Sequence, residues 1–338
     1  MKIFNDFSLK RFNTFGLNYK CDAFIEVEFA EEIYSINKMF ELDKARHLII
    51  GEGSNILLTK DFEGIVIHPV FNNLKIKTVE KNSVLIEVEA GKNWNDLVQF
   101  AVNKNLWGIE NLISIPGLVG AAPIQNIGAY GQEIKDVIET VQFFDFDDAL
   151  FKVYEKEKCR FDYRSSIFKQ ELKNRVFITS IELNLSKEPK PILDYGNVKD
   201  ELKKAEIINP TIEDMSNTIA KIRKSKLPSP EEIGNAGSFF KNPIIFSSKA
   251  EEIKKNYPDL PIFKTNNSSV KIPAAWLIEK IGYKGKTKGN VATYHKQPLV
   301  LINLGNATGE EILEFANEII VKVKQVFDIL LETEVNII

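Results

Sequence analysis

A lone serine stands in a glycine-rich stretch, residues 234–243, which reads Gly-Asn-Ala-Gly-Ser-Phe-Phe-Lys-Asn-Pro. No histidine neighbours Ser238 in the sequence, so it lacks the pattern of an acyl-transfer nucleophile. A serine hydroxyl can still donate a proton when a cation and a carboxylate adjust its acidity. The spacing alone leaves two interpretations open, a proton donor and an ordinary turn residue.

An arginine and a pair of glutamates stand in two other segments. Arg164 lies among aromatic residues in 161–168, Phe-Asp-Tyr-Arg-Ser-Ser-Ile-Phe, and a partly buried guanidinium needs an anionic partner. Glu332 and Glu334 alternate along 331–335, so a strand would place both on one face. On a solvent face the two acids would indicate no function. On an inner face their burial would destabilise the fold unless they served a function. A structural ion pair stays open for Arg164, and the spacing does not decide the role of the acids.

Two glycine-rich loops could accept a cofactor. Residues 51–55, Gly-Glu-Gly-Ser-Asn, follow a short apolar strand, and their backbone N–H groups could approach a phosphate. They match neither of the common phosphate-binding motifs, so a tight turn is the alternative. Residues 115–131, Ile-Pro-Gly-Leu-Val-Gly-Ala-Ala-Pro-Ile-Gln-Asn-Ile-Gly-Ala-Tyr-Gly, offer backbone donors and acceptors with little side-chain bulk. Such a lining suits a large flat cofactor, and a buried crossover loop is the alternative.

The elements that must position these residues follow from apolar periodicity. The patterns predict strands at 24–29, 47–50, 65–67, 83–89, 138–146, 149–154, 175–185 and 330–338. They predict helices at 30–41, 94–103, 211–224 and 309–328. Thr211 with Asp214, and Thr308 with Glu311, have the spacing of helix N-terminal capping pairs. The segment 226–230, Lys-Leu-Pro-Ser-Pro, indicates a domain boundary.

Composition excludes several classes of protein. The 338 residues include 44 Lys plus Arg and 47 Asp plus Glu, a net charge of −3, so nothing favours a nucleic-acid or membrane partner. Cys21 and Cys159 are far apart, which fits a reducing compartment better than a disulfide framework. The three histidines are scattered and predict no metal site. We expect neither a signal peptide nor a membrane-spanning segment.

Taken together, these segments resemble the UDP-N-acetylenolpyruvoylglucosamine reductase family, also called UDP-N-acetylmuramate dehydrogenase. The matching stretches are 13–16, 51–55, 91–94, 115–131, 161–168, 234–243 and 331–335. They occur in the family's order and span nearly the full length, which is far more specific than any one of them. Residues 193–197, Leu-Asp-Tyr-Gly-Asn, resemble an additional segment of the family's first type, whose tyrosine closes over the substrate. One departure is Thr333, where many members have proline.

The resemblance implies an α+β, three-domain flavoprotein. Two domains would form an FAD-binding pair of the vanillyl-alcohol-oxidase type, and a smaller α/β domain would bind substrate. On this basis we expect the first domain at 1–69 plus 329–338, the second at 70–227 and the third at 228–328. The resemblance also implies a cytoplasmic monomer that binds a UDP-sugar, with no nucleic-acid or membrane partner and no metal.

The family's reaction implies roles for single residues. NADPH reduces FAD, and the reduced flavin delivers hydride to the β carbon of the enolpyruvyl group. Arg164 and Glu334 match the positions that polarise the substrate carboxylate, and Ser238 matches the proton donor to the α carbon. The implied substrate contacts are Tyr130, Tyr195, Lys226 and Asn242. The implied contacts of a non-covalent FAD are Gly51, Gly53, Ser54, Asn55, Ile56, Pro116, Gly117, Gly120, Ala121, Ala122, Gln125, Asn126 and Gly128.

Two other functions stay open. An FAD oxidase of the same fold would be expected to carry a His or Cys for covalent flavin attachment, and 51–55 and 115–131 contain neither. A non-catalytic protein that binds nucleotide sugars would be expected to lose Ser238 or Arg164, and both are present.

Overall fold

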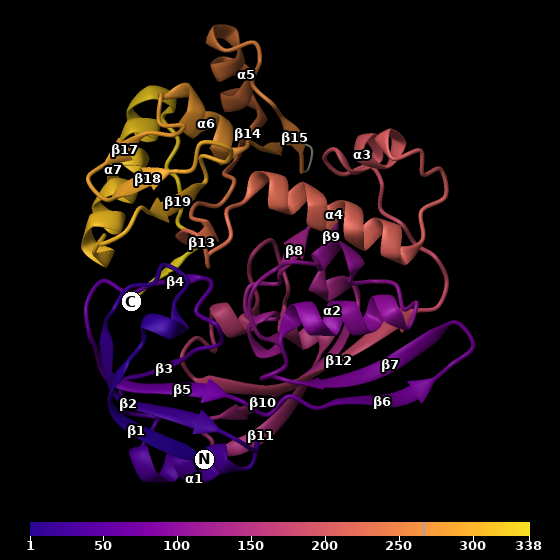
Figure 1. Ribbon diagram of the computed structural model, residues 1–338, viewed down its shortest axis with the longest axis vertical. Helices are drawn as coiled ribbons and strands as arrows, with labels where there is room; N and C mark the ends of the chain where they lie inside the picture. Colours follow the sequence, from indigo (N-terminus) through magenta and orange to yellow (C-terminus); the bar gives the residue numbers. More distant parts are fainter. Residues whose placement is uncertain (266–267) are drawn as a thin grey trace. The chain divides into compact units, whose positions relative to one another are not determined.

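The computed structural model describes residues 1–265 and 268–338, which form two compact units (Figure 1). The first unit contains residues 1–7, 21–52 and 63–225. The second unit contains residues 8–20, 53–62 and 226–338. Each unit combines helices with sheets, which confirms the α+β prediction. The division into three domains stays a prediction.

Two main sheets build the first unit, with strand orders β1-β2-β5-β3 and β11-β10-β12-β7-β6. The strands of the first sheet are β1 (Lys2–Ser8), β2 (Lys20–Val27), β3 (His47–Ile49) and β5 (Phe62–Pro69). Those of the second are β6 (Leu74–Val79), β7 (Ser83–Glu89), β10 (Ile138–Asp145), β11 (Leu150–Glu155) and β12 (Val176–Ser186). The short strands β8 (Gly128–Ala129) and β9 (Gln132–Glu133) pair with each other. The helices of this part of the chain are α1 (Glu32–Phe40), α2 (Trp94–Asn103), α3 (Val198–Lys204) and α4 (Ile212–Lys226).

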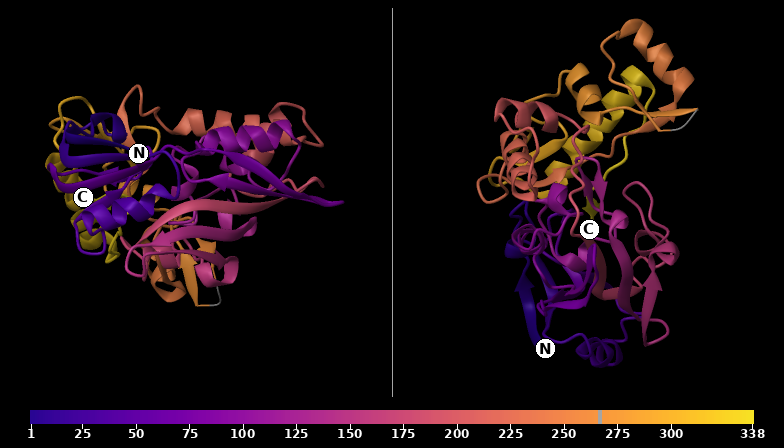
Figure 2. Two further views of the ribbon diagram at one scale, coloured as in Figure 1. Left: turned by 90° about the horizontal axis from the view of Figure 1, so that it is seen from below. Right: turned by 90° about the vertical axis from the view of Figure 1, so that its right-hand side faces the viewer.

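The five-stranded sheet is covered on one side by α2 and by α4 up to Ser225 (Figures 1 and 2). Val141 and Phe143 of β10 pack in one apolar core with residues of these helices, including Leu97 and Ile219. β10 and β12 can be buried in this way because β-branched and aromatic residues suit strands. A second core joins Phe144 and other aromatic residues to the apolar face of α1.

The second unit has a four-stranded sheet in the order β13-β19-β18-β17 and a three-stranded sheet in the order β14-β16-β15. Its strands are β4 (Ile56–Leu57), β13 (Gly234–Ser238), β14 (Ile244–Phe246), β15 (Phe263–Lys264), β16 (Ser269–Lys271), β17 (Thr287–Lys288), β18 (Val291–Thr293), β19 (Val300–Asn303) and β20 (Asn336–Ile337). Its helices are α5 (Ser247–Asn256), α6 (Ala274–Lys280) and α7 (Gly309–Phe327). Buried residues of α6 and α7 share one core with Phe239 and Phe240.

The predicted helix starts are confirmed. Thr308 and Glu311 form a reciprocal capping box at α7, with bonds of 3.1 and 2.7 Å. Thr211 and Asp214 exchange the same kind of bonds at the start of α4, at 2.9 and 3.1 Å. Each pair satisfies backbone N–H groups that the first turn of a helix leaves without an acceptor.

Two predicted strands are wrong in extent or pattern. The strand at 24–29 begins at Lys20 and ends at Val27, and both Phe24 and Ile25 are fully buried. Alternation fails there because β2 is covered on both sides, by Phe7 stacked on Phe24 at 4.3 Å and by the second core around Ile25.

The predicted strand at 330–338 is reduced to β20 and one bridge. Thr333 pairs with Phe240, whereas Asn336 and Ile337 pair in parallel with β4. The segment changes partner between these residues and therefore cannot continue as one strand. As a result, Glu332 is exposed and Glu334 is half-buried.

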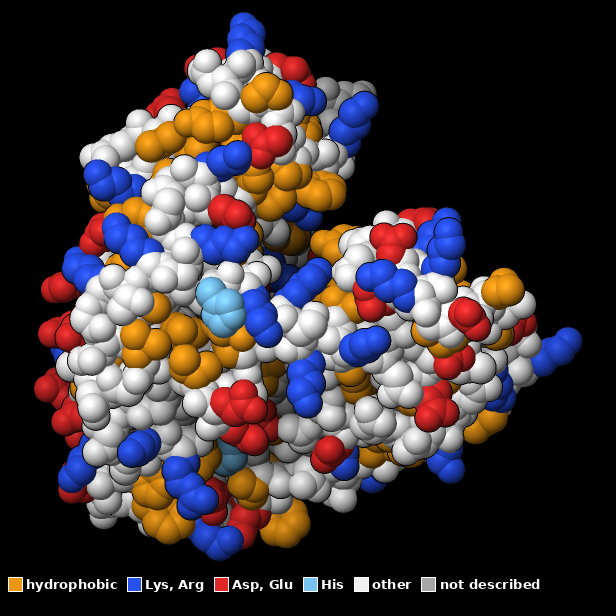
Figure 3. Space-filling model, turned by 45° about the horizontal axis from the view of Figure 1, so that its top comes forward, with side chains coloured by type: hydrophobic (Ala, Val, Ile, Leu, Met, Phe, Trp, Pro, Cys, Tyr) orange, Lys and Arg blue, Asp and Glu red, His pale blue; other side chains and the backbone are white. Residues whose placement is uncertain are grey.

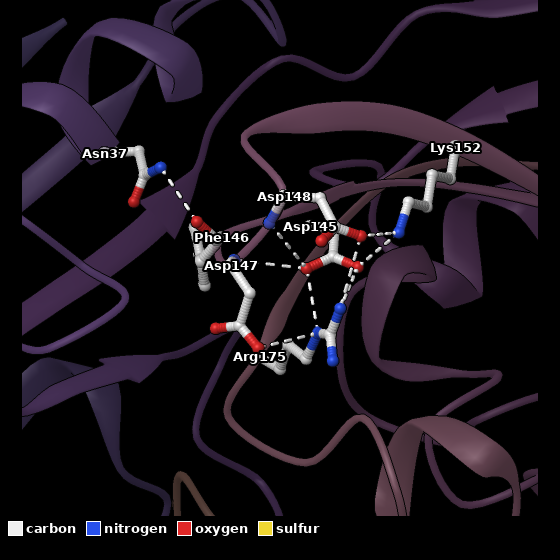
Figure 4. Close-up of polar contacts among 7 residues, drawn as sticks. All are labelled: Asn37, Asp145, Phe146, Asp147, Asp148, Lys152 and Arg175. Atoms are coloured by element: carbon white, nitrogen blue, oxygen red, sulfur yellow. Dashed lines mark hydrogen bonds and ion pairs between the residues drawn. The ribbon is translucent and has the colours of Figure 1, made fainter.

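A charged cluster fixes the turn between β10 and β11 (Figure 4). Arg175 donates two hydrogen bonds of 2.9 Å to the carboxylate of the buried Asp145, and Lys152 donates a third at 2.7 Å. Asn37 of α1 donates to the carbonyl of Phe146 at 3.1 Å, which ties the same turn to the helix.

Charges elsewhere are mixed, and Figure 3 shows acidic and basic side chains interspersed over the face that it presents. Within the described ranges, no helix has both the length and the apolar character needed to cross a membrane.

Candidate active site

The 115–131 loop is bound along its start to residues 90–94. Trp94 N donates to Gly117 O at 2.9 Å, and Val119 N donates to Lys92 O at 2.8 Å. Gly120 N donates to Ala90 O at 2.9 Å, and a Cβ on Gly120 would lie 2.7 Å from the Cβ of Ala90. Glycine is required at 120 because the two backbones approach so closely.

Glu52 joins the other glycine-rich loop to this pair of segments. Its carboxylate accepts from Asn93 Nδ2 at 2.6 Å and from Gly117 N at 2.8 Å. Asn93 also caps α2, because its Oδ1 accepts from Asp96 N at 3.1 Å. A Cβ on Gly51 would lie 3.3 Å from Leu118 Cγ, so the approach is close here as well.

The segment that carries Arg164 is attached to the later part of the 115–131 loop. Ser166 Oγ donates to Ile124 O at 2.7 Å, and Asn126 Nδ2 donates to Asp162 O at 3.0 Å. Arg164 Nη2 donates to Gly128 O at 2.7 Å. A Cβ on Gly128 would lie 2.8 Å from Glu133 Cγ, 3.0 Å from Gln132 O and 3.1 Å from Arg164 Nη1, so a larger residue would crowd all three.

Backbone conformation also sets the position of Arg164. It has φ +52° in a tight turn that is closed by two hydrogen bonds between Asp162 and Ser165, at 3.0 and 3.1 Å. A non-glycine residue in the left-handed region is uncommon and is held there by its surroundings. The half-buried guanidinium is therefore placed by the loop contacts rather than by free rotation.

Tyr130 and Tyr195 meet edge to face, with ring centroids 6.2 Å apart. Asn111 Nδ2 donates to Tyr130 O at 2.9 Å and holds this residue at φ +49°. Burial raises the pKa of the Tyr130 hydroxyl. Tyr195 is 54% exposed, so one ring of the pair is fixed and the other is accessible.

The C-terminal end of α4 is basic and carries Arg223, Lys224 and, as its last residue, Lys226. Arg223 Nη2 donates to Ser114 O at 3.3 Å. Burial lowers the pKa of the Arg223 guanidinium, the nearby Tyr130 opposes this shift, and the charge of Arg164 adds to it. Arg223 is thus a half-buried cation in the same unit as Arg164 and Tyr130.

In the second unit, Ser238 follows a β-bulge. β13 and β19 pair at Asn235 with Ile302 and again at Ser238 with Val300, so the register shifts between the two pairs. Gly237 has φ +66°, which glycine adopts without strain. Bulges re-aim the side chain that follows them, and the buried Phe239 and Phe240 then anchor the strand.

The strand of Ser238 lies beside the segment of Glu334. Glu334 N donates to Phe239 O at 2.8 Å, and Lys241 N donates to Glu332 O at 2.9 Å. Lys241 and Glu332 also form an ion pair of 2.9 Å. Asn55 Nδ2 donates to Glu334 O at 3.3 Å, which connects the 51–55 loop to the same segment.

The structure distributes the predicted site residues over both units. The first unit contains Arg164, Tyr130, Tyr195, Gly51, Pro116, Gly117, Gly120, Ala121, Ala122, Gln125, Asn126 and Gly128. The second contains Ser238, Glu334, Lys226, Asn242, Gly53, Ser54, Asn55 and Ile56. Asn242 accepts a hydrogen bond from Ala274 N at 2.9 Å, at the start of α6.

Four supporting residues escaped the sequence analysis: Glu52, Asn93, Asn111 and Arg223. A glutamate between two glycines and an asparagine directly before a helix were available signals. Asn111 and Arg223 carry no local signal, because their partners become neighbours only in the fold.

The first unit fits a flat dinucleotide cofactor. Among the described residues, the backbone N–H groups of Gly51 and Glu52 have no acceptor within the protein. Consecutive free N–H groups favour an anion such as a diphosphate. The 115–131 loop adds backbone groups and small residues, as a ring edge requires. These features fit FAD, which would be held by the two loops.

Comparison with known families agrees with FAD as the cofactor. A family described as FAD binding domain matches residues 21–153, and the fold and loops together define an FAD-dependent oxidoreductase. A second family, described as UDP-N-acetylenolpyruvoylglucosamine reductase, C-terminal domain, matches residues 229–338.

Full-length relatives are equally consistent. A UDP-N-acetylenolpyruvoylglucosamine reductase of Flavobacterium johnsoniae is 43% identical over 339 residues, covering 100% of both chains. One of Pseudomonas aeruginosa is 40% identical and covers 98% of this chain and 97% of its own. The crystal structure of the reductase from Thermus caldophilus has a TM-score of 0.65 at 25% identity and covers 99% of this chain and 98% of its own. The chain belongs to the UDP-N-acetylenolpyruvoylglucosamine reductase family.

Proposed function

We propose that this protein reduces the enolpyruvyl group of UDP-N-acetylglucosamine enolpyruvate to give UDP-N-acetylmuramate, with NADPH as the electron donor. The reaction would supply a peptidoglycan precursor in the cytoplasm, and the enzyme would act as a monomer. The names of the full-length relatives support the substrate.

The observation that carries the proposal is the pairing of the Ser238 strand with the Glu334 segment. Glu334 N donates to Phe239 O at 2.8 Å, so the backbone of Glu334 lies beside the residue that follows Ser238. A proton donor and an acid that polarises a carboxylate need this kind of fixed proximity.

The residues divide the reaction between them. FAD, when bound, supplies the hydride chemistry that connects NADPH to the β carbon of the enolpyruvyl group. Arg164 donates hydrogen bonds to the substrate carboxylate, where negative charge develops. Glu334 polarises the same carboxylate. Ser238 Oγ donates its proton to the α carbon, which completes the addition of two hydrogens across the double bond.

Other residues hold the substrate and the cofactor. Tyr195, Lys226 and Asn242 would contact the UDP portion, and Tyr130 would support Tyr195 through their ring contact. Lys226 and the half-buried Arg223 would offset the diphosphate charge in a protein that is acidic as a whole.

The FAD contacts are proposed at Gly51, Gly53, Ser54, Asn55, Ile56, Pro116, Gly117, Gly120, Ala121, Ala122, Gln125, Asn126 and Gly128. The binding would be non-covalent, because neither loop contains a His or Cys. Acid precipitation should release all yellow flavin to the supernatant, and flavin in the pellet would contradict this.

Steady-state NADPH oxidation tests the proposal. The rate should rise on addition of UDP-N-acetylglucosamine enolpyruvate, and UDP-N-acetylmuramate should appear in equal amount. NADPH oxidation that is rapid, consumes oxygen and does not depend on the sugar nucleotide would instead favour the oxidase alternative. Light scattering of the purified protein tests the monomer.

A further inference from the structure

Glu52 occupies a position where an acidic residue looks unfavourable. It lies between Gly51 and Gly53, in a loop proposed to bind the diphosphate of FAD. A carboxylate beside two phosphates would weaken binding by charge repulsion. Its contacts give a reason for its presence.

The carboxylate is engaged by two donors from separate segments. Asn93 Nδ2 donates to Oε1 at 2.6 Å, and Gly117 N donates to Oε2 at 2.8 Å. Both bonds have a charged acceptor, which makes each stronger than a neutral hydrogen bond. Glu52 is half-buried, so water competes only in part.

These partners are themselves fixed. Asn93 caps α2 through Oδ1, and Trp94 N donates to Gly117 O at 2.9 Å. The start of α2 and the 115–131 loop are thus already bonded to each other. Glu52 bonds the start of the 51–55 loop to both of them.

We propose that Glu52 is a positioning residue for FAD, which sets the distance between the two cofactor loops before FAD binds. The inference rests on the proposed assignment of FAD to these loops. Its effect is on the apoprotein: with the loops already placed, less ordering is required when the cofactor binds.

The proposal predicts the sign of a substitution. Glu52→Gln removes a negative charge, which alone would strengthen FAD binding. The glutamine amide has only one oxygen, so it can accept from Asn93 Nδ2 or from Gly117 N but not from both. Its NH₂ group would face the other donor, and one hydrogen bond would be lost. If positioning dominates, Glu52→Gln weakens FAD binding at least 10-fold, the low end of the effect of a lost hydrogen bond to a charged group.

A compensating change at Asn93 makes the test specific. Asn93→Asp keeps the oxygen that caps α2 but places a second carboxylate against Glu52, so it should also weaken FAD binding. In the double variant, the amide introduced at position 52 accepts from Gly117 N and donates to the carboxylate introduced at position 93. Both hydrogen bonds are restored with the donor and acceptor exchanged, and the FAD dissociation constant should return to within about 3-fold of wild type.

The experiment is titration of apoprotein with FAD, followed by the quenching of flavin fluorescence. Far-UV circular dichroism of each apoprotein reports folding, and Glu311→Gln is the matched control, since Glu311 accepts a backbone N–H at 2.7 Å in the second unit. An unchanged or tighter dissociation constant in Glu52→Gln would overturn the proposal, as would a double variant no better than the single ones. If Glu52→Gln does not fold, the double variant decides by the same criterion. Failure of wild-type apoprotein to bind FAD would instead overturn the cofactor assignment.

Discussion

Asn55 Nδ2 donates a hydrogen bond of 3.3 Å to the backbone carbonyl of Glu334. In return, Asn336 donates to Asn55 O from both its backbone and its side chain, at 3.0 Å each. A residue proposed to contact FAD and a residue proposed to polarise the substrate are thus held by one network. If both proposed roles hold, a change at Asn55 should also shift the backbone of 334–336, which carries Glu334.

The Thr333 departure from the family pattern should be neutral. Thr333 faces Phe240 in a pair whose hydrogen bonds are made by the flanking residues, Lys241 N to Glu332 O and Glu334 N to Phe239 O. Proline lacks an N–H, and this position does not donate one to the ladder. Thr333→Pro should therefore keep turnover within about 2-fold and leave the Tm unchanged or raised, because proline restricts the unfolded chain.

Lys241→Pro is the control, since Lys241 N does donate to the ladder. It should lower the Tm by several degrees, as the loss of about 1 kcal/mol or more predicts. Equal effects of the two substitutions in thermal unfolding would show that the ladder geometry is not the reason.

Acid stability should depend on Asp145. Burial alone would raise the pKa of its carboxyl, but hydrogen bonds from Arg175 and Lys152 outweigh burial and lower it from 3.8 to about 2. A depressed pKa contributes stability that is fully present above the unfolded value and is lost as the pH falls through the folded value. Asp145→Asn should thus cost about 2 kcal/mol at pH 7, and the difference from wild type should shrink between pH 4 and about pH 2.

Urea unfolding at a series of pH values measures this difference. Asp147→Asn is the matched control, because Asp147 also contacts Arg175, at 3.1 Å, but its side chain is 50% exposed. An exposed pair contributes less than about 1 kcal/mol. A pH-independent penalty for Asp145→Asn would contradict the linkage argument.

Tyr195 should serve binding more than chemistry. Tyr195→Phe keeps the edge contact with Tyr130 and removes only the hydroxyl, so KM for the sugar nucleotide should rise by about 10-fold, as the loss of one hydrogen bond predicts. Reduction of the flavin by NADPH should not change. Tyr34→Phe is the control, because Tyr34 is 52% exposed and meets Phe144 edge to face at 6.3 Å. A collapse of NADPH reduction in Tyr195→Phe would refute the binding role.

The sequence was informative where structure is determined locally. In each capping pair, at the start of α4 and at the start of α7, the two residues are three positions apart in the sequence. The prediction of both pairs is confirmed. The partners of Glu52 lie 41 and 65 positions away, so no local pattern could reveal them.

The same limit explains the position of Ser238. Its bulge exists because β13 shifts register against β19, and the sequence of the turn does not specify this pairing. The apolar residues of the segment after α7 predict one strand. Its change of partner at Thr333 and Asn336 depends on two distant strands.

The sharpest prediction concerns Ser238. If its hydroxyl donates the proton to the α carbon, Ser238→Ala should leave flavin reduction by NADPH nearly intact, because that step takes no proton from it. Reoxidation by the sugar nucleotide should slow at least about 100-fold, the low end of the contribution of a positioned general acid. Ser238→Cys should recover part of this rate, since a thiol is the stronger acid but is larger. Stopped-flow traces of the flavin band, recorded separately for reduction and reoxidation, measure both steps. If Ser238 only shaped the turn after Gly237, both steps and the flavin content would fall together, and Arg164 and Glu334 would be the only catalytic candidates left.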